Sequence, residues 1–487
     1  MSETSPATSA YDPHDIRLGV VRGISYGLFG PADAFVPQAR ALGAGLVRCY
    51  VYWGQVEPEP GRFTWTAVDA LLDQLDGDEE VWITLCSSSP WATREATDFL
   101  PPSPARDLSA YARFVREVVR RCAGRVRYWQ CDNEPSNTGL LWAGTAEEYV
   151  TQLQAMYAAV KQADPGAVVV LGGCGYDVLS AEEGGEPRRF FEHVTRAGRD
   201  AFDVFDVHLY GEAARVPGHL ATAGELMRAH GYLKPIVAGE YAAPIPFEFP
   251  EVGAVMYQAL AEAFAQAPRT QSTAELAERE QGGTPERRAM TALYERMPEL
   301  PPKLQMFMEG CPGELEAKRH RVNRRQLVMG TVLALAEGVR RTAYWNLAPE
   351  VAAPVGPRQV MHLMFGKLAL MEYKGADLAV RRPAGDAFAL MAERLAGVRG
   401  VRRAEIAGLP AGVRAFEADR GGRGPLLVLW DERDMFDGED EPPVTVTLPW
   451  SAPTATAVDA LGGRPVTEAG DKTLRLPVSL TPVFLTA

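Results

Sequence analysis

Two glutamates each close a run of β-type residues in a way that suggests catalysis. Glu134 stands at the end of RVRYWQCDNE, directly before Pro135, and Glu240 ends KPIVAGE, directly after Gly239. Proline has no backbone N–H and stops a strand, so Glu134 is expected to project from the edge of a sheet. Two carboxyl groups in one pocket can divide the work of cleaving a glycosidic bond, because one protonates the leaving oxygen while the other attacks the anomeric carbon.

The spacing of the two glutamates fits a closed barrel of parallel strands. Glu240 follows Glu134 by about 106 residues, which is about three βα steps of ~35 residues and corresponds to strands four and seven. These strands face each other across an eight-stranded barrel. Because barrel enzymes keep their catalytic groups at the carboxyl ends of the strands, both side chains are expected at the same rim.

The first 345 residues alternate short apolar runs with longer helical patterns, which indicates repeated βα units and a parallel sheet. In helical stretches such as LSAYARFVREVVRRCAG, apolar residues recur every three to four positions. An open doubly wound sheet would alternate in the same way, but the first strand is followed by SYGLFGPADAF and not by a glycine-rich phosphate loop. An α/β fold of the (β/α)8 TIM-barrel type is therefore predicted, with strands at Leu18–Tyr26, Leu46–Tyr52, Glu80–Ser87, Val126–Asp132, Ala167–Gly173, Phe202–Tyr210, Pro235–Glu240 and Thr342–Leu347.

One connection is much longer than the others. About 105 residues separate Glu240 from Trp345, whereas a barrel of ~250 residues uses about 31 per step, so roughly 70 residues are inserted. The amphipathic stretch Val322–Arg340 is the expected seventh helix, which places a largely helical insertion at about 246–320 after strand seven. The insertion leaves the rim that carries the glutamates. It is therefore expected either to overhang the pocket or to be a peripheral element for dimerisation or stability.

After the last barrel helix, near MHLMFGKLALME, the pattern changes to short alternating runs such as PLLVLWDE, VTVTLPW and TPVFLTA. These runs, separated by Gly and Pro turns, predict a C-terminal all-β sandwich. The acidic loop DMFDGEDEPP within it is expected to be a solvated turn. The predicted organisation is a disordered or extended N-terminus at 1–16, a catalytic barrel at 17–385 and an accessory β-sandwich at 395–487.

Composition limits the partners. The 487 residues carry a formal net charge of −13 with scattered Lys and Arg, which argues against nucleic acid as a partner. No run reaches the ~18 apolar residues of a membrane helix, and the start MSETSPATSAYDPHD has no basic and apolar leader. Neither a membrane partner nor export is expected, and the cytoplasm is the predicted location. The six cysteines form no CxxC or Cys/His spacing, which favours reduced core thiols and predicts no metal site.

The segments NEPSNTGLLWAGTAEEY and VYWGQVEPEPGRFTW, together with the two glutamates, resemble glycoside hydrolases of clan A, most like family 39 and its relatives. The resemblance spans most of residues 17–350. It implies a retaining enzyme that cleaves an O-glycosidic bond of a carbohydrate or glycoside through a covalent glycosyl-enzyme, with no cofactor. Glu134 would be the general acid/base and Glu240 the nucleophile.

Other positions match the clan residue by residue, and the resemblance implies a role for each. Arg48 corresponds to an arginine near the nucleophile, which would hold that carboxylate ionised. Asn133 matches the asparagine that hydrogen-bonds the sugar 2-hydroxyl. His208 and Tyr210 match a His-x-Tyr pair whose tyrosine orients the nucleophile, and Trp345 matches the tryptophan on which the sugar packs.

Each of these residues also has a purely structural interpretation. Arg48 could be an ion-pair residue of the barrel mouth, His208 a core histidine and Trp345 part of the packing at the rim. Trp91, in SSSPWATR after the third strand, is a further candidate for substrate binding with the same alternative. Glu57, in QVEPEPG, is interpreted as part of a turn fixed by prolines and receives no catalytic role.

Two other functions stay open on the sequence alone. A transglycosidase would use the same glutamate pair, with a sugar hydroxyl in place of water. A carbohydrate-binding barrel without turnover is less favoured, because binding does not need two opposed carboxyl groups. A homo-oligomer is compatible with all three.

Overall fold

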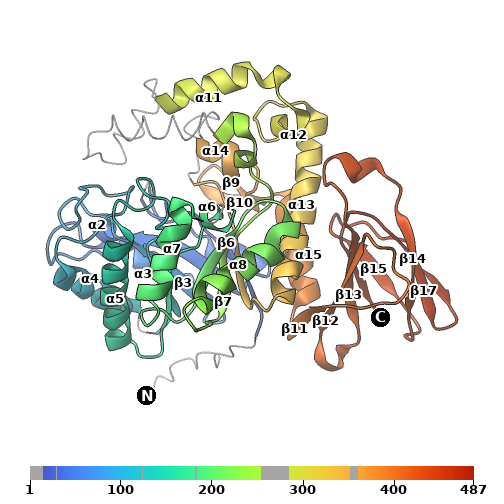
Figure 1. Cartoon of the computed structure of the whole chain (residues 1–487), viewed down its shortest axis with the longest axis horizontal. Coiled ribbons are helices and arrows are strands. Elements are labelled where there is room, and N and C mark those ends of the chain that lie inside the picture. Colours follow the sequence, from blue (N-terminus) through green and yellow to red (C-terminus); the bar gives the residue numbers. More distant parts are fainter. Residues whose placement is uncertain (1–14, 29, 123, 181–183, 254–284, 351–359) are drawn as a thin grey trace.

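We describe the chain in a computed structural model. The residues described are 15–28, 30–122, 124–180, 184–253, 285–350 and 360–487. A barrel of βα units in these residues is followed by an all-β domain at the C-terminus (Figure 1). The N-terminus predicted to be disordered or extended lies almost wholly outside the described residues, as does part of the predicted insertion.

Eight parallel strands form the barrel that the sequence predicts. Their order, β5-β4-β3-β2-β1-β8-β7-β6, places each strand beside its neighbour in the chain and pairs β1 with β8. Single bridges from Val170 to Val204 and from Cys174 to Val207 join the two remaining edges and close the barrel. The strands are β1 (Arg17–Val21), β2 (Leu46–Tyr52), β3 (Glu80–Cys86), β4 (Tyr128–Cys131), β5 (Val168–Val170), β6 (Phe205–Leu209), β7 (Ile236–Tyr241) and β8 (Arg341–Tyr344).

Helices follow the strands and cover the outside of the barrel (Figure 1). In α4, Tyr111, Phe114 and Val118 are buried on one face, as its amphipathic sequence predicts. In α5, Thr145 and Glu148 form a capping box, in which each side chain accepts a hydrogen bond from the other residue's backbone N–H. None of the helices in the described residues is long and apolar enough to cross a membrane. The covering helices are α1 (Val36–Ala41), α2 (Trp53–Val56), α3 (Thr66–Leu72), α4 (Leu108–Cys122), α5 (Ala146–Ala163), α6 (Tyr176–Leu179), α7 (Glu186–Ala197), η1 (Ala213–Arg215), α8 (Val216–Arg228), α13 (Gly313–Ala336) and α15 (Pro383–Leu395).

The long connection between β7 and β8 packs at the carboxyl end of the barrel. Its η2 lies against α14, and Phe249 beside η2 meets Phe307 beyond α12, with ring centroids 6.1 Å apart. The predicted end of the insertion, at about residue 320, lies inside α13. This one helix begins at Gly313 and contains most of the predicted seventh helix of the barrel. The elements here are η2 (Pro246–Glu248), α11 (Pro285–Glu295), η3 (Met297–Glu299), α12 (Pro302–Gln305) and α14 (Val360–Phe365).

The last part of the barrel differs from the prediction. The segment near MHLMFGKLALME contains only the short α14, and a hairpin of β9 (Met371–Lys374) and β10 (Asp377–Arg381) follows it. Gly375, whose φ is +68°, lies in the turn of this hairpin. The helix that follows the eighth strand and covers the barrel there is α15, which packs against α13. A boundary at residue 385 therefore falls inside a helix, and the barrel unit extends to Leu395.

The C-terminal domain is the predicted all-β sandwich. One sheet has the order β11-β12-β13-β18-β15 and the other the order β14-β17-β16. Leu429, Leu448 and Leu476 lie in a hydrophobic core of its own between them. The elements are β11 (Gly400–Arg403), β12 (Val413–Asp419), η4 (Gly421–Arg423), β13 (Leu426–Asp431), η5 (Asp437–Asp440), β14 (Val444–Pro449), β15 (Thr456–Asp459), β16 (Glu468–Gly470), β17 (Thr473–Val478) and β18 (Val483–Thr486).

The acidic loop of the sandwich is not the solvated turn that the sequence predicts. Glu439 accepts hydrogen bonds from Arg321 at 2.6 and 2.9 Å and from Arg325 at 2.7 Å, and both arginines belong to α13. Lys318 of the same helix lies 3.7 Å from the Glu439 carboxylate. The loop therefore ties the sandwich to the barrel. The prediction was wrong because these partners lie more than a hundred residues away in the sequence.

We predict that Glu439→Gln weakens this junction in a pH-dependent way. Burial opposes ionisation, but the hydrogen bonds and charges of Arg321 and Arg325 lower the pKa of Glu439 to about 2. The stabilisation is therefore complete above the ordinary glutamate pKa of 4.5 and is lost as pH falls toward about 2. The variant should have a lower Tm than wild type at pH 7, and the difference should shrink as pH falls through this window.

The control is Glu417→Gln, which breaks an exposed pair with Arg402 and should change Tm little. Calorimetry at several pH values measures both variants. Equal losses of Tm in the two variants at pH 7 would contradict a special role for Glu439.

Candidate active site

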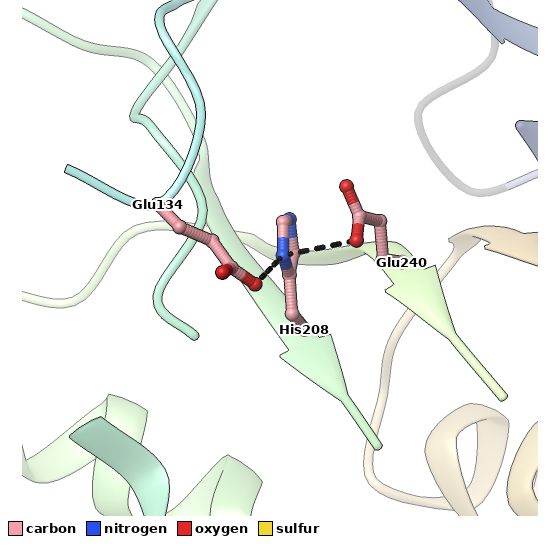
Figure 2. A group of neighbouring side chains, drawn as sticks. All are labelled: Glu134, His208 and Glu240. Carbon is pink, nitrogen blue, oxygen red and sulfur yellow. Dashed lines mark hydrogen bonds and ion pairs between the residues drawn. The ribbon is translucent and has the colours of Figure 1, made fainter. Parts of the chain in front are cut away.

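Glu134 and Glu240 meet at the carboxyl end of the barrel, with His208 between them (Figure 2). Glu134 lies in the turn after β4, His208 on β6 and Glu240 near the end of β7. The Nδ1 atom of His208 is 2.6 Å from Glu134 Oε1 and 3.3 Å from Glu240 Oε2. One ligand atom from each of the three residues lies within 4.8 Å of the others. The two carboxyl groups therefore share one site, as the spacing of the sequence predicts.

A turn with unusual backbone angles carries Glu134 into the site. Asp132 has a φ of +52° and Glu134 a φ of +40°, in the left-handed region that costs a residue with a side chain about 1–2 kcal/mol. The buried Asp132 carboxylate anchors the turn. It accepts hydrogen bonds from the backbone N and Oγ of Ser87, at 2.7 and 2.9 Å, and from Gln152 Nε2 at 3.0 Å. The turn is thus fastened to β3 and α5, which compensates for its backbone strain.

The guanidinium of Arg48, on β2, is fully buried beneath the two glutamates. Its Nη1 donates to Glu240 Oε1 at 3.0 Å, and its Nη2 donates to Gln130 Oε1 at 2.7 Å and to Asn133 Oδ1 at 2.8 Å. Burial alone would lower the pKa of Arg48, but Tyr50, Glu240 and other neighbouring groups raise it above the ordinary value. Arg48 is therefore a permanent cation that contacts the Glu240 carboxylate.

Two tyrosine hydroxyls also donate to Glu240. Tyr210 Oη lies 2.6 Å from Oε2, and Tyr50 Oη lies 2.5 Å from Oε1. Burial raises the pKa of both phenols well above 10, so both keep the proton that they donate. The sequence analysis missed Tyr50. The signal was its position two residues after Arg48 on the same strand, which puts both side chains on the same face of β2.

His208 is held from its other side by Asp206, a residue that the sequence analysis also missed. Asp206 Oδ2 is 3.2 Å from His208 Nε2, and its Oδ1 accepts from Gly239 N at 2.6 Å. Burial alone would lower the pKa of His208, but Glu240, Asp206 and the hydrogen bonds to Asp206 and Glu134 raise it to about 10. The ring is therefore an imidazolium at neutral pH.

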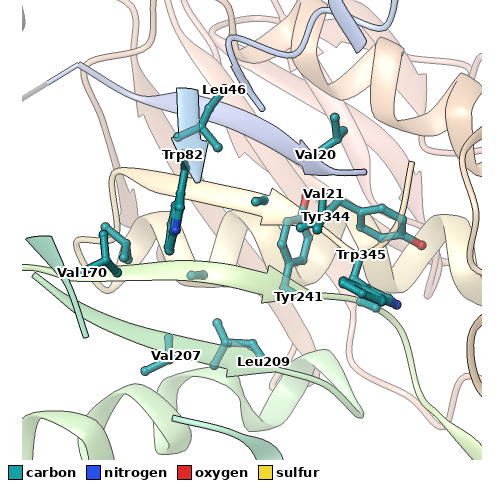
Figure 3. Close-up of a cluster of buried hydrophobic side chains, with 14 of the residues drawn as sticks. Val20, Val21, Leu46, Trp82, Val170, Val207, Leu209, Tyr241, Tyr344 and Trp345 are labelled. Atoms are coloured by element: carbon teal, nitrogen blue, oxygen red, sulfur yellow. The ribbon is translucent and has the colours of Figure 1, made fainter. Parts of the chain in front are cut away.

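Aromatic rings line the site beside Glu240. Figure 3 shows Trp345 at the end of the buried cluster that includes Tyr344. The ring of Trp345 meets Tyr50 edge-on, with centroids 6.4 Å apart, and Phe365 of α14 at 5.5 Å. Phe365 also contacts Tyr210 at 5.7 Å. The indole Nε1 of Trp345 is buried and has no hydrogen-bond partner among the described residues.

Trp91 belongs to a different group of residues. Its Nε1 donates to Glu57 O at 2.8 Å, and its ring packs edge-on against Trp53 at 5.6 Å. The buried Glu57 carboxylate accepts hydrogen bonds from Trp53 Nε1, Gly61 N and Arg113 Nη2 at 2.7–2.8 Å. The described contacts do not join Trp91 to either catalytic candidate. Its role in binding substrate stays a prediction.

The donor atoms of Glu134, His208 and Glu240 are close enough to surround a metal ion. A histidine binds a metal as neutral imidazole, through a free lone pair. His208 is protonated at neutral pH, and both of its nitrogens face carboxylates. A metal ion here would therefore have to displace a proton from His208, and the absence of a metal site stays a prediction.

Comparison with known proteins gives a match at the level of structure only. No protein-family model matches the sequence, and no curated protein does. A family 39 glycoside hydrolase from the gut symbiont Bacteroides cellulosilyticus WH2 matches with a TM-score of 0.61 at 13% identity, over 97% of this chain and 81% of the other. A family 39 β-xylosidase from Caulobacter crescentus matches with a TM-score of 0.56 at 15% identity, over 96% and 95%. A family 51 α-L-arabinofuranosidase from Bifidobacterium longum matches at 0.55 and 12%, over 98% and 97%.

The chain has the fold of these glycoside hydrolases. The likeness covers the barrel and the sandwich together, since it spans almost the whole chain. The resemblance to clan A that the sequence motifs suggested is confirmed for the fold.

We predict that Asp132 makes the stability of the protein depend on pH near neutrality. Burial raises the pKa of Asp132 to about 7, although hydrogen bonds from Ser87 and Gln152 oppose the shift. Because the pKa in the folded state lies above the ordinary 3.8, the associated stability is complete below about pH 4 and is lost as pH rises through 7. Asp132→Asn cannot ionise, so it should lose less stability than wild type between pH 5 and pH 8.

Thermal unfolding followed by circular dichroism at the two pH values measures the difference. The exposed Asp200→Asn is the control and should behave as wild type does. If Asp132→Asn loses as much Tm as wild type over this interval, another group is responsible for the pH dependence.

Proposed function

We propose that this protein is a retaining glycoside hydrolase, with Glu240 as the nucleophile and Glu134 as the general acid/base. The observation that carries the proposal is the short distance between two carboxyl groups at one rim of the barrel. One oxygen of each carboxyl group lies within 4.8 Å of one oxygen of the other, a spacing compatible with the ~5–5.5 Å carboxyl separation of retaining enzymes.

The surroundings of Glu240 suit a nucleophile. Arg48 and two tyrosine hydroxyls donate to its oxygens, and each of these hydrogen bonds favours the carboxylate over the acid. The same contacts hold the side chain in one orientation, which reduces the entropy lost on reaching the transition state.

Four charged groups lie around Glu134, the proposed acid/base. Arg48 and His208 supply two positive charges, and Glu240 and Asp206 supply two negative charges in direct contact with them. These four charges balance one another, and the contact with the His208 cation favours an ionised Glu134, so another neighbour is needed to keep its proton. The Glu134 side chain is also 16% exposed, compared with 4% for Glu240, which gives it access to water.

The reaction proceeds in two displacements. An oxygen of Glu240 attacks the anomeric carbon as the bond to the leaving oxygen breaks, and that oxygen takes the proton of Glu134. Water then attacks the same carbon, gives a proton to the Glu134 carboxylate and releases Glu240. Asn133 uses Oδ1 to accept from Arg48, so its amide Nδ2 is the group available to the sugar 2-hydroxyl. The Trp345 ring, which contacts Tyr50 beside Glu240, is the proposed packing surface for the sugar.

The structural neighbours guide the choice of test substrates. They include a β-xylosidase, a glucosidase and an α-L-arabinofuranosidase. We therefore propose a carbohydrate or glycoside substrate and a panel of 4-nitrophenyl pentosides and hexosides as the first assay.

We predict that Glu240→Ala loses at least about 10³-fold in kcat on every substrate that wild type hydrolyses, because no covalent intermediate can form. Azide can enter the space left by the carboxylate and attack the anomeric carbon directly. It should restore turnover and give a glycosyl azide of inverted configuration. Release of nitrophenol and NMR of the product measure the two effects.

Glu417→Gln, on the surface of the sandwich, serves as the control and should keep full activity. Unchanged activity in Glu240→Ala would remove this residue from the mechanism. Absence of turnover by wild type on the whole panel and on natural oligosaccharides would favour a binding protein.

We predict a different pattern for Glu134→Ala. Substrates with poor leaving groups need the proton and should lose about 10²–10⁴-fold in kcat/KM. Substrates with 2,4-dinitrophenol as leaving group do not need it, so formation of their glycosyl-enzyme should be almost unaffected. Pre-steady-state kinetics separates the two steps.

Proton NMR of the first product formed by wild type tests retention, since the initial anomer must match the substrate. Inversion would exclude Glu240 as nucleophile. A product that carries an added sugar in place of water would identify a transglycosidase with the same residues.

A further inference from the structure

A third carboxyl group, which the proposed mechanism does not use, lies beside Glu134. Asp177 belongs to the short helix α6, which follows β5. A Cβ placed on Gly175 would be 2.6 Å from Asp177 Oδ1, 3.0 Å from Glu134 Cδ and 3.2 Å from Glu134 Oε1. The two carboxyl groups therefore border the same point, and a side chain at position 175 would push them apart.

Burial and the neighbouring Glu134 oppose ionisation of Asp177, whereas Ser136 and the backbone of Val178 and Asp177 favour it. Its Oδ2 accepts one hydrogen bond from Ser136 Oγ at 2.9 Å. Its Oδ1 is covered by protein atoms and has no hydrogen-bond partner in the described part of the chain. Ser136 lies two residues after Glu134 in the same turn, so this hydrogen bond holds α6 next to the acid/base candidate.

Titratable and charged side chains surround both carboxyl groups. Those that face Asp177 are Glu134 and Cys174, with Arg188 beyond Cys174, and those that face Glu134 are Asp177, Cys174, His208, Tyr210 and Glu240. The cation in contact with Glu134 is His208, which favours the ionised form of the glutamate. Asp177 is a half-buried acid that lies near the same Glu134 carboxyl group. Its negative charge disfavours the ionised form of Glu134.

We propose that Asp177 is a positioning residue that keeps the proton on Glu134 until the leaving group takes it. Two carboxyl groups that share one small region are not both ionised without a large repulsion, so a charge on Asp177 disfavours a charge on Glu134. Asp177 forms no bond to substrate and keeps its own charge throughout. This inference rests on the proposed role of Glu134.

The protonation behaviour of Asp177 agrees with this coupling. Burial is the first cause that raises its pKa, and the negative charge of Glu134 is the second. Hydrogen bonds from Ser136 and from the backbone of Val178 and Asp177 lower the pKa, and the net value is about 6. Above this pH Asp177 is an anion and opposes loss of the proton from Glu134. The effect is therefore present at neutral pH and fades as pH falls through about 6.

The test is the pH dependence of kcat/KM for Asp177→Asn with a poor leaving group. Without the negative charge, Glu134 should lose its proton more easily, and the alkaline limb should move to lower pH by about one unit. The acid limb, which reports the nucleophile, and KM should stay as in wild type. With a 2,4-dinitrophenyl glycoside, which needs no acid, formation of the glycosyl-enzyme should lose its alkaline limb in both proteins.

Two further variants keep the test decisive. Ser136→Ala removes the donor that stabilises the Asp177 anion, so it should move the alkaline limb in the same direction by a smaller amount. Asp200→Asn, an exposed aspartate on the same barrel, is the matched control and should leave the profile unchanged. An unchanged alkaline limb in Asp177→Asn, or an equal loss of rate at all pH values and on both substrates, would overturn the proposal.

A direct titration separates this inference from the proposed function. Carbon-13 NMR of protein labelled at the glutamate carboxyl carbon, with Glu134→Gln to assign the signal, follows Glu134 without any substrate. Its midpoint should fall in Asp177→Asn. If the enzyme hydrolyses no glycoside, the proposed function fails but this titration still decides the coupling. If hydrolysis is confirmed and the midpoint does not move, only the role of Asp177 is lost.

Discussion

The contact between the buried guanidinium of Arg48 and the Glu240 carboxylate is the interaction on which the site depends. A single charge inside a barrel costs several kcal/mol, so neither group could be buried ionised without the other. Arg48 also reaches Gln130 and Asn133 on the fourth strand and the loop after it, while Glu240 belongs to the seventh. One side chain thereby fixes the distance between the two halves of the rim that carry the glutamates.

A polar layer inside the barrel extends this contact across the strands. Gln130 links Arg48 to Asp206 through hydrogen bonds of 2.7 Å at each end, and Asp206 holds His208. The layer leaves no room for side chains at two positions. A Cβ on Gly239 would lie 2.5 Å from both Asp206 oxygens, and one on Gly173 would lie 2.2 Å from His208 Nε2. Small residues at strand ends are thus part of what orients the charged ones.

The sequence predicted the strands and residues that a local pattern marks. It did not predict residues whose role depends on a contact far away in the chain. Alternating apolar runs located all eight strands, and the ends of the fourth and seventh located Glu134 and Glu240. The structure places five further predicted residues around these glutamates: Arg48, Asn133, His208, Tyr210 and Trp345. It does not join Trp91 to either glutamate by a described contact. Asp206 was missed because one acid inside an apolar run carries no local signal until its partners are known. The same holds for Asp177 in a short loop helix, and for Glu439, whose arginines lie on another domain.

The two glutamates are chemically identical, so their different tasks must come from the backbone that carries them. Glu240 lies on a barrel strand, where neighbouring strands hold its carboxylate from several sides, and this suits a group that must stay ionised and fixed. Glu134 lies in a strained turn beyond the strand end. It contacts His208 on one side and lies near Asp177 on the other. A group in that position keeps access to water, which the proposed mechanism requires because Glu134 would give a proton in one step and recover it in the next. The strand and the turn thus give the two glutamates different surroundings before any substrate binds, and the proposed division of roles follows from that difference.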